Sequence, residues 1–487
     1  MLTDTPAPAL RRSLAWVGMG QVAYIVLTFL GSVAVARLLT PYDTGVFAIA
    51  ASTIGLLAII QAMGLNNFLI REPELTPDLI ATTYTVNAMI SVLLAMMIVL
   101  IGIAGGFFFR DAGVRDVLLV LAVVPIIGQL AFLPNAMLER EGRFRTLALM
   151  KTTSTALGLL MTVGFALAGY RYMSLAYSQV GTALVTNLIL LVVARRHVSF
   201  RFSLTHWASV SRFGAQIFAI SGISRMAQRM SDIVLGRLVG LPALGLYSRA
   251  ASNYNMLWDN IHTIAARVLI VDFAAVHRSG AALRDRYVQA SRMLTSVLWP
   301  AFLGVAVLAG PLIRIVYGEK WDGAAVPLTL LCLAGVLLSS ITMAWEVFIV
   351  MGETGRQARL EVSRTIIGFG LFVAGCLHSL EAAALARVGD AMVAQFIYRR
   401  HLCRLTGTTP VDLYRVYWSS ALLCVPAVAP AVVVMAMWRW SPAVPPAAIV
   451  AAIVIGGLGW VVALRQSGHP LWAEVTRLLN RRRAVSA

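Results

Sequence analysis

Charged side chains are scarce in this chain. They account for 13% of its 487 residues, about half the share of soluble domains, while hydrophobic residues account for 59% and the mean hydropathy is +0.79. The apolar runs are ~18–27 residues long and lack the short alternating pattern of transmembrane β-strands. The composition therefore excludes a soluble globular protein and predicts an all-α integral membrane protein.

Cysteine is rare as well, and none of the four cysteines shows the spacing of a metal site or a redox pair. We expect them to fill space between helices, and we predict no metal and no cofactor. They are Cys332, Cys376, Cys403 and Cys424.

Acidic residues are outnumbered, because 22 Asp and Glu stand against 40 Lys and Arg, for a net charge of +18. In a soluble protein this excess would suggest a nucleic-acid partner. Here the basic clusters connect apolar runs, and the positive-inside bias of cytoplasmic loops explains them, so no nucleic acid is expected. Most of the arginines fall in alternate loops and in the tail that ends with Arg481, Arg482 and Arg483. This asymmetry predicts that both termini lie in the cytoplasm.

Motifs of enzymes are missing too. The sequence has no Ser/His/Asp set on an exposed loop, no Gly-rich phosphate loop with a Lys, and no cluster of metal ligands. We therefore predict that the chain is not an enzyme. Without an ATP-binding loop, any transport would depend on an ion gradient or on the gradient of the substrate itself.

A short connector between two apolar runs occurs twice. Residues 37–47 read RLLTPYDTGVF and residues 237–247 read RLVGLPALGLY. A repeated Pro/Gly connector indicates a duplicated helical unit. For the two arginines, fixing the tight connector is favoured over substrate contact. The shared positions are Arg37, Pro41 and Gly45 in the first copy and Arg237, Pro242 and Gly245 in the second.

The apolar runs predict about fourteen transmembrane helices, arranged as six, six and two. An even number per repeat places both repeats in the same orientation, as in transporters that work by alternating access. We expect an N-terminal six-helix bundle over 1–200, a second bundle over 201–410, and two more helices with a basic tail over 411–487. The expected helices lie near 13–36, 44–63, 80–106, 117–138, 147–168, 172–194, 211–238, 244–265, 287–310, 324–347, 360–378, 381–399, 416–437 and 443–464.

Three motifs carry a resemblance to a known family. They are the Ala36–Pro41 connector that runs into Gly45, the LEREGRF loop over 138–144, and the YGEKW segment over 317–321. Together they resemble the polysaccharide-biosynthesis (Wzx-type) flippases of the multidrug/oligosaccharidyl-lipid/polysaccharide superfamily. The resemblance reaches to about residue 400 and includes the helix count.

The resemblance implies a MATE-like, V-shaped carrier in the bacterial inner membrane. Its substrate would be an undecaprenyl-diphosphate-linked oligosaccharide, moved from the cytoplasmic to the periplasmic leaflet for lipopolysaccharide, exopolysaccharide or capsule. Expected partners are this polyprenyl-diphosphate-linked glycan, membrane lipids, a coupling proton or sodium ion, and the polysaccharide polymerase and glycosyltransferases of the pathway. The runner-up is a cation-coupled multidrug antiporter of the same superfamily. From another class, a membrane glycan polymerase or ligase would need a large outer loop, which the sequence lacks.

Charges inside predicted helices are the candidate functional residues, since each should face a cavity or a partner. Arg225 and Arg229 lie one turn apart and are expected to grip the diphosphate, against the alternative of an ion-pair network with Asp232 and Asp390. For Arg249 and Arg387, lining the cavity and pairing or snorkelling stay open.

Four carboxylates could bind a coupling ion, although pairing with the arginines is the simpler alternative. His262, one turn from Asp259, could relay protons or simply pack between helices. Uncharged amides of the first repeat, such as Asn87 and Gln129, suit either sugar hydroxyls or contacts between helices. The carboxylates are Asp232, Asp259, Asp390 and Glu346.

Overall fold

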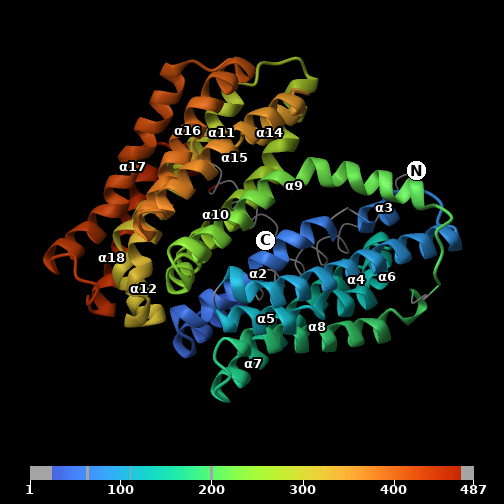
Figure 1. The fold of residues 1–487 in the computed structure, drawn as a ribbon. Helices are drawn as coiled ribbons and strands as arrows, with labels where there is room; N and C mark the ends of the chain where they lie inside the picture. The colour runs from blue at the N-terminus through green and yellow to red at the C-terminus, as the bar shows by residue number, and fades with distance from the viewer. Residues whose placement is uncertain (1–24, 62–64, 110, 198–200, 473–475, 477–487) are drawn as a thin grey trace, which may run out of the picture. The chain divides into compact units, whose positions relative to one another are not determined.

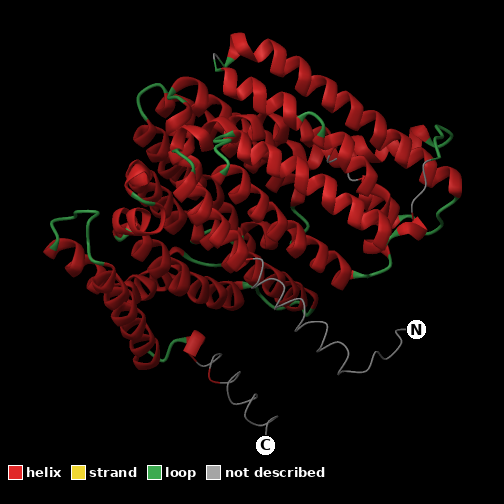
Figure 2. Cartoon of the chain, turned by 90° about the horizontal axis from the view of Figure 1, so that it is seen from below, coloured by secondary structure: helices red, strands yellow, loops and turns green. Residues whose placement is uncertain are grey.

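The computed structural model describes residues 25–61, 65–109, 111–197, 201–472 and 476, and it is helical throughout this part of the chain (Figure 1; Figure 2). No strand occurs in these ranges. The chain divides into two compact units, Met1–Gly245 and Leu246–Ala487. The prediction of an all-α protein is therefore confirmed.

In the first unit, α2 packs against α9 and α5, α4 packs against α5 and α6, and α7 packs against α8. A core cluster of Leu65, Phe68, Leu79 and Val210 joins α3, α4 and α9. The helices of this unit are Ile25–Leu38, α2 (Pro41–Gln61), α3 (Leu65–Arg71), α4 (Pro77–Phe108), α5 (Ala112–Leu121), α6 (Val124–Arg140), α7 (Phe144–Leu167), α8 (Met173–Val193) and α9 (Trp207–Leu238), with the short 3-10 turn Arg195–His197 between the last two.

In the second unit, α15 packs against α16, α11 packs against α17 and α13, and α17 packs against α18. Helix α10 (Leu241–Arg278) begins in the first unit and continues through the second. The other elements are α11 (Arg284–Val307), α12 (Ala309–Tyr317), the 3-10 helix η2 (Glu319–Ala324), α13 (Ala325–Ser339), α14 (Ala344–Val350), α15 (Thr354–Cys376), α16 (Leu380–Thr406), α17 (Pro410–Met437) and α18 (Pro446–Gln466).

Local sequence explains where several helices begin and end. Asp111 and Ser379 cap α5 and α16 with side-chain oxygens that accept backbone N–H groups of the first turn. Thr409 forms a capping box at the start of α17, where Pro410 takes the first helical position. Gly407 ends α16 with a φ of 73°, a left-handed conformation that favours glycine.

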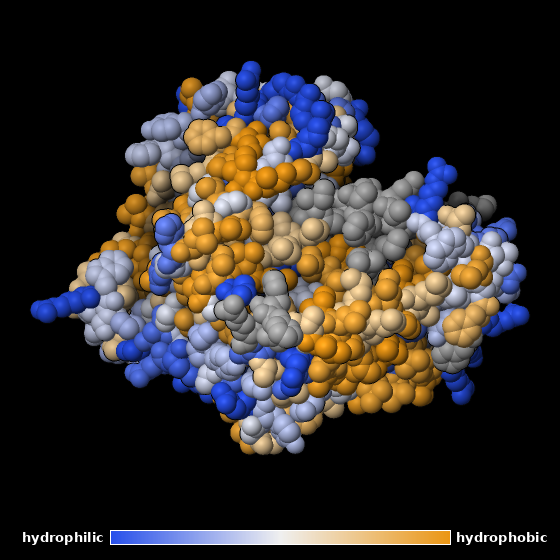
Figure 3. All heavy atoms as spheres, in the orientation of Figure 1, coloured by the Kyte–Doolittle hydropathy of each residue, from blue (hydrophilic) through white to orange (hydrophobic). Residues whose placement is uncertain are grey.

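Nine helical stretches of the described residues are long and apolar enough to cross a membrane. Hydrophobic side chains cover the sides of the long helices, and hydrophilic ones gather towards helix ends (Figure 3). Leu160, Leu167 and Val192 on α7 and α8 are 70%, 71% and 74% exposed. Side chains of this kind face lipid at no cost, so the chain is a multi-pass membrane protein.

Four further helices have the length of a membrane span but not its apolarity. They are α9, α10, α15 and α16, with 32, 38, 23 and 27 residues. Their charged side chains lower the hydropathy. A charged helix face in the bilayer must be turned towards protein or water, so these four helices are where polar contacts are expected.

Two expected helices are interrupted, and one is longer than expected. The expected helix 117–138 is divided into α5 and α6, and 324–347 is divided into α13 and α14. Helix α10 runs on to Arg278, so the expected connection over 266–286 is mostly helical. Apolar runs locate a span but do not show a turn inside it. The count of fourteen spans stays a prediction.

Candidate functional site

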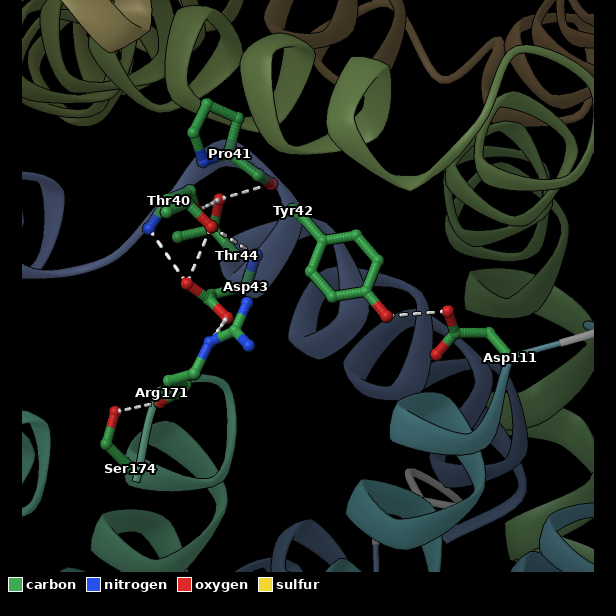
Figure 4. A network of polar contacts seen from close by, with 8 residues as sticks. All are labelled: Thr40, Pro41, Tyr42, Asp43, Thr44, Asp111, Arg171 and Ser174. Carbon is green, nitrogen blue, oxygen red and sulfur yellow. Dashed lines mark hydrogen bonds and ion pairs between the residues drawn. The ribbon is translucent and has the colours of Figure 1, made fainter. Parts of the chain in front are cut away.

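The first turn of α2 is held by a capping box that the connector sequence encodes. The Asp43 carboxylate accepts hydrogen bonds from the backbone N–H of Thr40 at 3.0 Å and from its hydroxyl at 2.6 Å. The Asp43 N–H donates in return to Thr40 Oγ1 at 3.2 Å (Figure 4). Two N–H groups that the helix cannot satisfy itself are thereby paired.

The same turn is tied to two other parts of the first unit (Figure 4). Tyr42 donates its hydroxyl to Asp111 Oδ2 at 2.7 Å, and Asp111 Oδ1 caps α5. Arg171, in the turn between α7 and α8, places its Nε 3.4 Å from Asp43 Oδ1. Arg171 has a φ of 45°, a strained conformation for a residue with a side chain, and Ser174 holds it by donating to its carbonyl at 2.6 Å.

The two copies of the connector glycine lie in a reciprocal contact within the first unit. A Cβ on Gly45 would overlap the carbonyl group of Leu241, and a Cβ on Gly245 would overlap the carbonyl group of Pro41. The first turns of α2 and α10 therefore meet backbone to backbone, and only glycine permits this approach. Pro242 stands in the first turn of α10, as Pro41 does in α2. Arg37 and Arg237 are exposed at the ends of the preceding helices.

Polar and small residues alternate along the seam between α2 and α9. A Cβ on Gly236 would lie 2.8 Å from Ile49 Cδ1. One turn earlier on α9, Asp232 accepts a hydrogen bond from the Ser52 hydroxyl at 2.8 Å. These contacts place one face of α9 against α2 over successive turns.

Arg229 continues this seam. Its side chain crosses the helix surface at Gly55 of α2, where a Cβ would lie 2.7 Å from Arg229 Nε. The residue is exposed. The side chain of Arg225 lies outside the described residues, although its backbone belongs to α9. Arg225 and Arg229 are therefore one turn apart along α9.

In the second unit, Arg249 is buried in an aromatic cage. Its Cζ lies 5.0 Å from the centre of the Tyr317 ring and 4.8 Å from that of Trp321. Tyr317 in turn donates its hydroxyl to Asn253 Oδ1 at 2.7 Å. Cation–π contacts of this kind stabilise a cation that has left water. Tyr317 and Trp321 of the YGEKW segment therefore hold the guanidinium group of Arg249 inside the second unit.

Arg387 also lies on an aromatic ring. Its Cζ is 4.2 Å from the centre of the Phe372 ring, and its Nε donates to the Tyr247 hydroxyl at 3.1 Å. Tyr247 and Phe372 contact each other edge to face, with centroids 5.7 Å apart. The guanidinium group thus connects α10, α15 and α16 within the second unit.

Asp390 has a partner that the sequence did not suggest. Arg364 places its Nη2 3.0 Å from Asp390 Oδ2 and its Nε 3.3 Å from Oδ1. The carboxylate is pressed against Gly368, where a Cβ would lie 2.5 Å from Oδ1. Arg364 lies inside the expected helix 360–378 and belongs to α15, almost three turns from its start at Thr354. A two-pronged ion pair of this kind holds α15 against α16.

The other two candidate carboxylates differ in environment. Glu346 is 3% exposed and its Oε2 atom is buried without a hydrogen-bond partner among the described residues. Asp259 on α10 is exposed. The sequence placed both in spans but could not rank them by burial, because the turn that precedes Glu346 is not visible in an apolar run.

Amide side chains of the first unit hold helices together. Asn87 donates to Gln129, and Gln129 donates to the Tyr84 carbonyl at 3.0 Å. Asn187 donates to the Ile127 carbonyl at 3.0 Å. These contacts bear out the packing alternative for these residues. Within the described part of the chain, no three His, Cys, Asp or Glu side chains gather as metal ligands.

A family model described as "Polysaccharide biosynthesis protein" matches residues 34–326, more than half of the chain. This chain belongs to the polysaccharide biosynthesis protein family. The match begins just before the first connector and includes the second connector and the YGEKW segment. The expected family is thereby confirmed.

Proteins of three bacteria resemble the chain. The lipopolysaccharide biosynthesis protein WzxC of Escherichia coli K12 is 23% identical over 326 residues, which are 66% of each chain. The teichuronic acid biosynthesis protein TuaB of Bacillus subtilis 168 is 28% identical over 57% of this chain and 58% of its own. The succinoglycan biosynthesis transport protein ExoT of Rhizobium meliloti 1021 is 24% identical over 70% and 69%. The matched part thus spans slightly less than two thirds of WzxC and 58% of TuaB.

Two solved structures share the fold. The lipid II flippase MurJ, in an inward closed conformation, superposes with a TM-score of 0.75 over 92% of this chain and 97% of its own, at 11% identity. An inward-facing MATE transporter of the MOP superfamily gives 0.60 over 79% and 96%, at 14% identity. Identities this low show the fold alone.

Proposed function

We propose that this protein is a flippase for undecaprenyl-diphosphate-linked oligosaccharides. Its family and the relatives named for lipopolysaccharide, teichuronic acid and succinoglycan biosynthesis support the substrate class. The observation that carries the proposal is the segregation of charge onto α9, α10, α15 and α16 in a membrane fold. Lipid-facing helices do not need such charges, whereas a path for a charged headgroup does.

Arg229 and Arg225 are the proposed contacts for the diphosphate. Arg229 is exposed on α9, and Arg225 lies one turn away on the same helix. Two guanidinium groups at this spacing grip phosphate oxygens in a two-pronged manner. Arg249 and Arg387 would have to leave their aromatic rings to reach a substrate, so we propose that they contact it in another conformation of the carrier.

The proposed mechanism is alternating access between two repeats over 1–200 and 201–410, with 411–487 as an addition to the second. The repeated connector and the reciprocal contact of Gly45 and Gly245 support the duplication. We propose the bacterial inner membrane as its location, with both termini in the cytoplasm, where the glycosyltransferases deliver substrate. A polysaccharide polymerase would take the product on the other side.

Export in the host cell tests the proposal. In a strain that lacks the gene, we expect surface polysaccharide to disappear and lipid-linked oligosaccharide to accumulate in the inner leaflet. Arg225→Ala and Arg229→Ala should each fail to restore export while the protein inserts normally. Arg115→Ala is the matched control, because Arg115 is exposed on α5 and pairs with the neighbouring Asp116.

Normal export with both substitutions would contradict the diphosphate contact. A null strain with intact polysaccharide but greater sensitivity to cationic drugs would instead indicate the multidrug antiporter. Drug sensitivity of the same strain thus distinguishes the cation-coupled multidrug antiporter from the flippase.

A further inference from the structure

The helix that leads to Glu346 is broken inside a membrane span. The span Glu319–Val350 is apolar enough to cross the bilayer, yet α13 ends at Ser339 and α14 begins at Ala344. Residues 340–343 form turns in between. Irregular backbone at membrane depth is stable only where protein groups or water satisfy its polar atoms. Broken spans are also where membrane carriers place ion sites.

Side chains of other helices satisfy the backbone around this break. Because a carbonyl oxygen can only accept, the Nε2 atom of His262 must carry the hydrogen that bonds Thr342. The three contacts are Gln395 Nε2 of α16 to Leu337 O at 2.6 Å, Tyr417 Oη of α17 to Ser340 O at 3.0 Å, and His262 Nε2 of α10 to Thr342 O at 3.3 Å.

Two oxygens next to the break have no partner among the described residues. They are Oε2 of Glu346, a residue that is 97% buried, and Oγ1 of Thr342 one turn earlier. A buried carboxylate oxygen without a hydrogen bond is costly, and binding a proton or a metal cation removes the cost. A hard metal ion collects about six oxygen ligands, but the carbonyl oxygens of Leu337, Ser340 and Thr342 at the break already accept hydrogen bonds from side chains. A proton needs one acceptor and almost no space.

The surroundings of Glu346 provide a route for that proton. His262, which acts electrostatically on Glu346, is half-buried and stacks on Trp258 with ring centroids 5.5 Å apart. Asp259 is exposed one turn before it on α10. Burial thus increases in the order Asp259, His262, Glu346.

Several charged residues on the helices packed against α14 have partners of their own. Helices α15 and α16 both contact α14. Arg364 pairs with Asp390 and Glu361, and Arg356 and Arg404 pair with Glu353, the residue at the start of α15.

We propose that Glu346 is a buried proton-binding site at the break between α13 and α14, loaded through His262. The imidazole takes a proton from solvent and passes it to the Glu346 carboxylate, which becomes a neutral carboxyl group while the imidazole returns to its neutral form. When Glu346 is ionised it needs a partner, and the turn over 340–343 is the element that can move to provide one. A role of Glu346 in coupling transport to protons rests on the proposed function, whereas proton binding by Glu346 does not.

Infrared difference spectroscopy of the purified full-length protein in lipid nanodiscs tests the binding site. Spectra recorded across a pH titration should contain the band of one protonated buried carboxyl group that Glu346→Gln removes. Glu353→Gln is the matched control and should leave the band in place, because Glu353 is paired with Arg356 and Arg404. His262→Asn should move the midpoint of the titration.

A spectrum of Glu346→Gln that equals the wild-type spectrum would overturn the assignment, and an unmoved midpoint in His262→Asn would remove the imidazole from the route. Export in cells is the second measurement. Glu346→Gln, which is fixed in the neutral form, should lower export at least tenfold, while Glu353→Gln should not. Wild-type export in Glu346→Gln would overturn the coupling role. If the wild-type gene itself supports no export, the proposed function fails, and the infrared result still decides the site.

Discussion

Replacing Gly45 by Ala should destabilise the first unit far more than an ordinary helix glycine would. The added Cβ would lie 2.6 Å from the carbonyl carbon of Leu241 and closer still to its oxygen. Non-bonded carbon atoms prefer a separation of about 3.5–4.0 Å, so α2 and the first turn of α10 must separate by about 1 Å. The obstacle is backbone, which cannot rotate away as a side chain can.

The size of the effect follows from two opposing contributions. Ala in a helix interior is better than Gly by up to about 1 kcal/mol. Overpacking costs about 1–3 kcal/mol where side chains can adjust, and more where they cannot. We therefore expect a net loss of about 2 kcal/mol or more for Gly45→Ala, and a similar loss for Gly245→Ala, which meets the carbonyl of Pro41.

The double substitution tests the reciprocal geometry itself. A single separation of α2 from α10 relieves both overlaps, so Gly45→Ala with Gly245→Ala should cost clearly less than the sum of the two single changes. Gly128→Ala on α6 is the matched control, because a Cβ there meets nothing within 4 Å, and it should be neutral or slightly stabilising.

Thermal unfolding of the purified variants in detergent, at one scan rate, measures these differences. Midpoints for Gly45→Ala and Gly128→Ala that agree within error would refute the close backbone contact. Strictly additive losses of stability in the double variant would mean that the two glycines are tightly packed independently, and would refute a single contact that both share.

Two more predictions concern the second unit. Asp390→Ala should lower stability by about 2–4 kcal/mol, because it removes the two-pronged partner of the Arg364 guanidinium and leaves only the longer contact with Glu361 at 3.5 Å. Replacing Asp390 and Arg364 with Met should recover much of the loss, and equal thermal midpoints for the single and double variants would contradict this. The buried His469, beyond the last span, has its pKa lowered to about 4 by burial and by the nearby Arg292. An unfolded histidine binds its proton near pH 6.5, so stability should fall by about 3 kcal/mol as the pH drops from about 6.5 to 4. In His469→Asn, whose amide oxygen can replace Nδ1 as acceptor for the Leu471 N–H, the thermal midpoint should fall less between pH 7 and pH 5; equal falls would refute the linkage.

The membrane class and the family could be predicted from sequence because each depends on features of many residues. Apolar length reports a span whatever surrounds it. The repeated Pro and Gly of the connector were visible as a pattern in the sequence. The reason for the glycines, which is the contact of each with a carbonyl group of the other connector, is visible only in the folded structure. Thr40 and Asp43 also carried a readable signal, since their spacing is that of a capping box.

Partners of charged residues could not be predicted, because they come from distant parts of the chain. Nothing near Asp390 in sequence indicates Arg364, and nothing near Arg249 indicates Tyr317 and Trp321. The break before Glu346 was hidden for a different reason. Its residues are Ser340, Ile341, Thr342 and Met343, which continue an apolar run without a proline or glycine, so only contacts from other helices favour a turn there.

The two connectors share their glycine and differ in their polar residues. Both connectors keep the glycine, because each glycine lies against a carbonyl group of the other connector. A side chain at either position would hold the first turns of α2 and α10 apart. The polar capping of the first copy, Thr40 with Asp43, is replaced in the second by Gly240 and Ala243. A cap can be lost for about 1 kcal/mol, whereas a Cβ against a carbonyl cannot be accommodated without moving a helix. Packing therefore restrains the glycines of the two connectors more tightly than it restrains their polar residues.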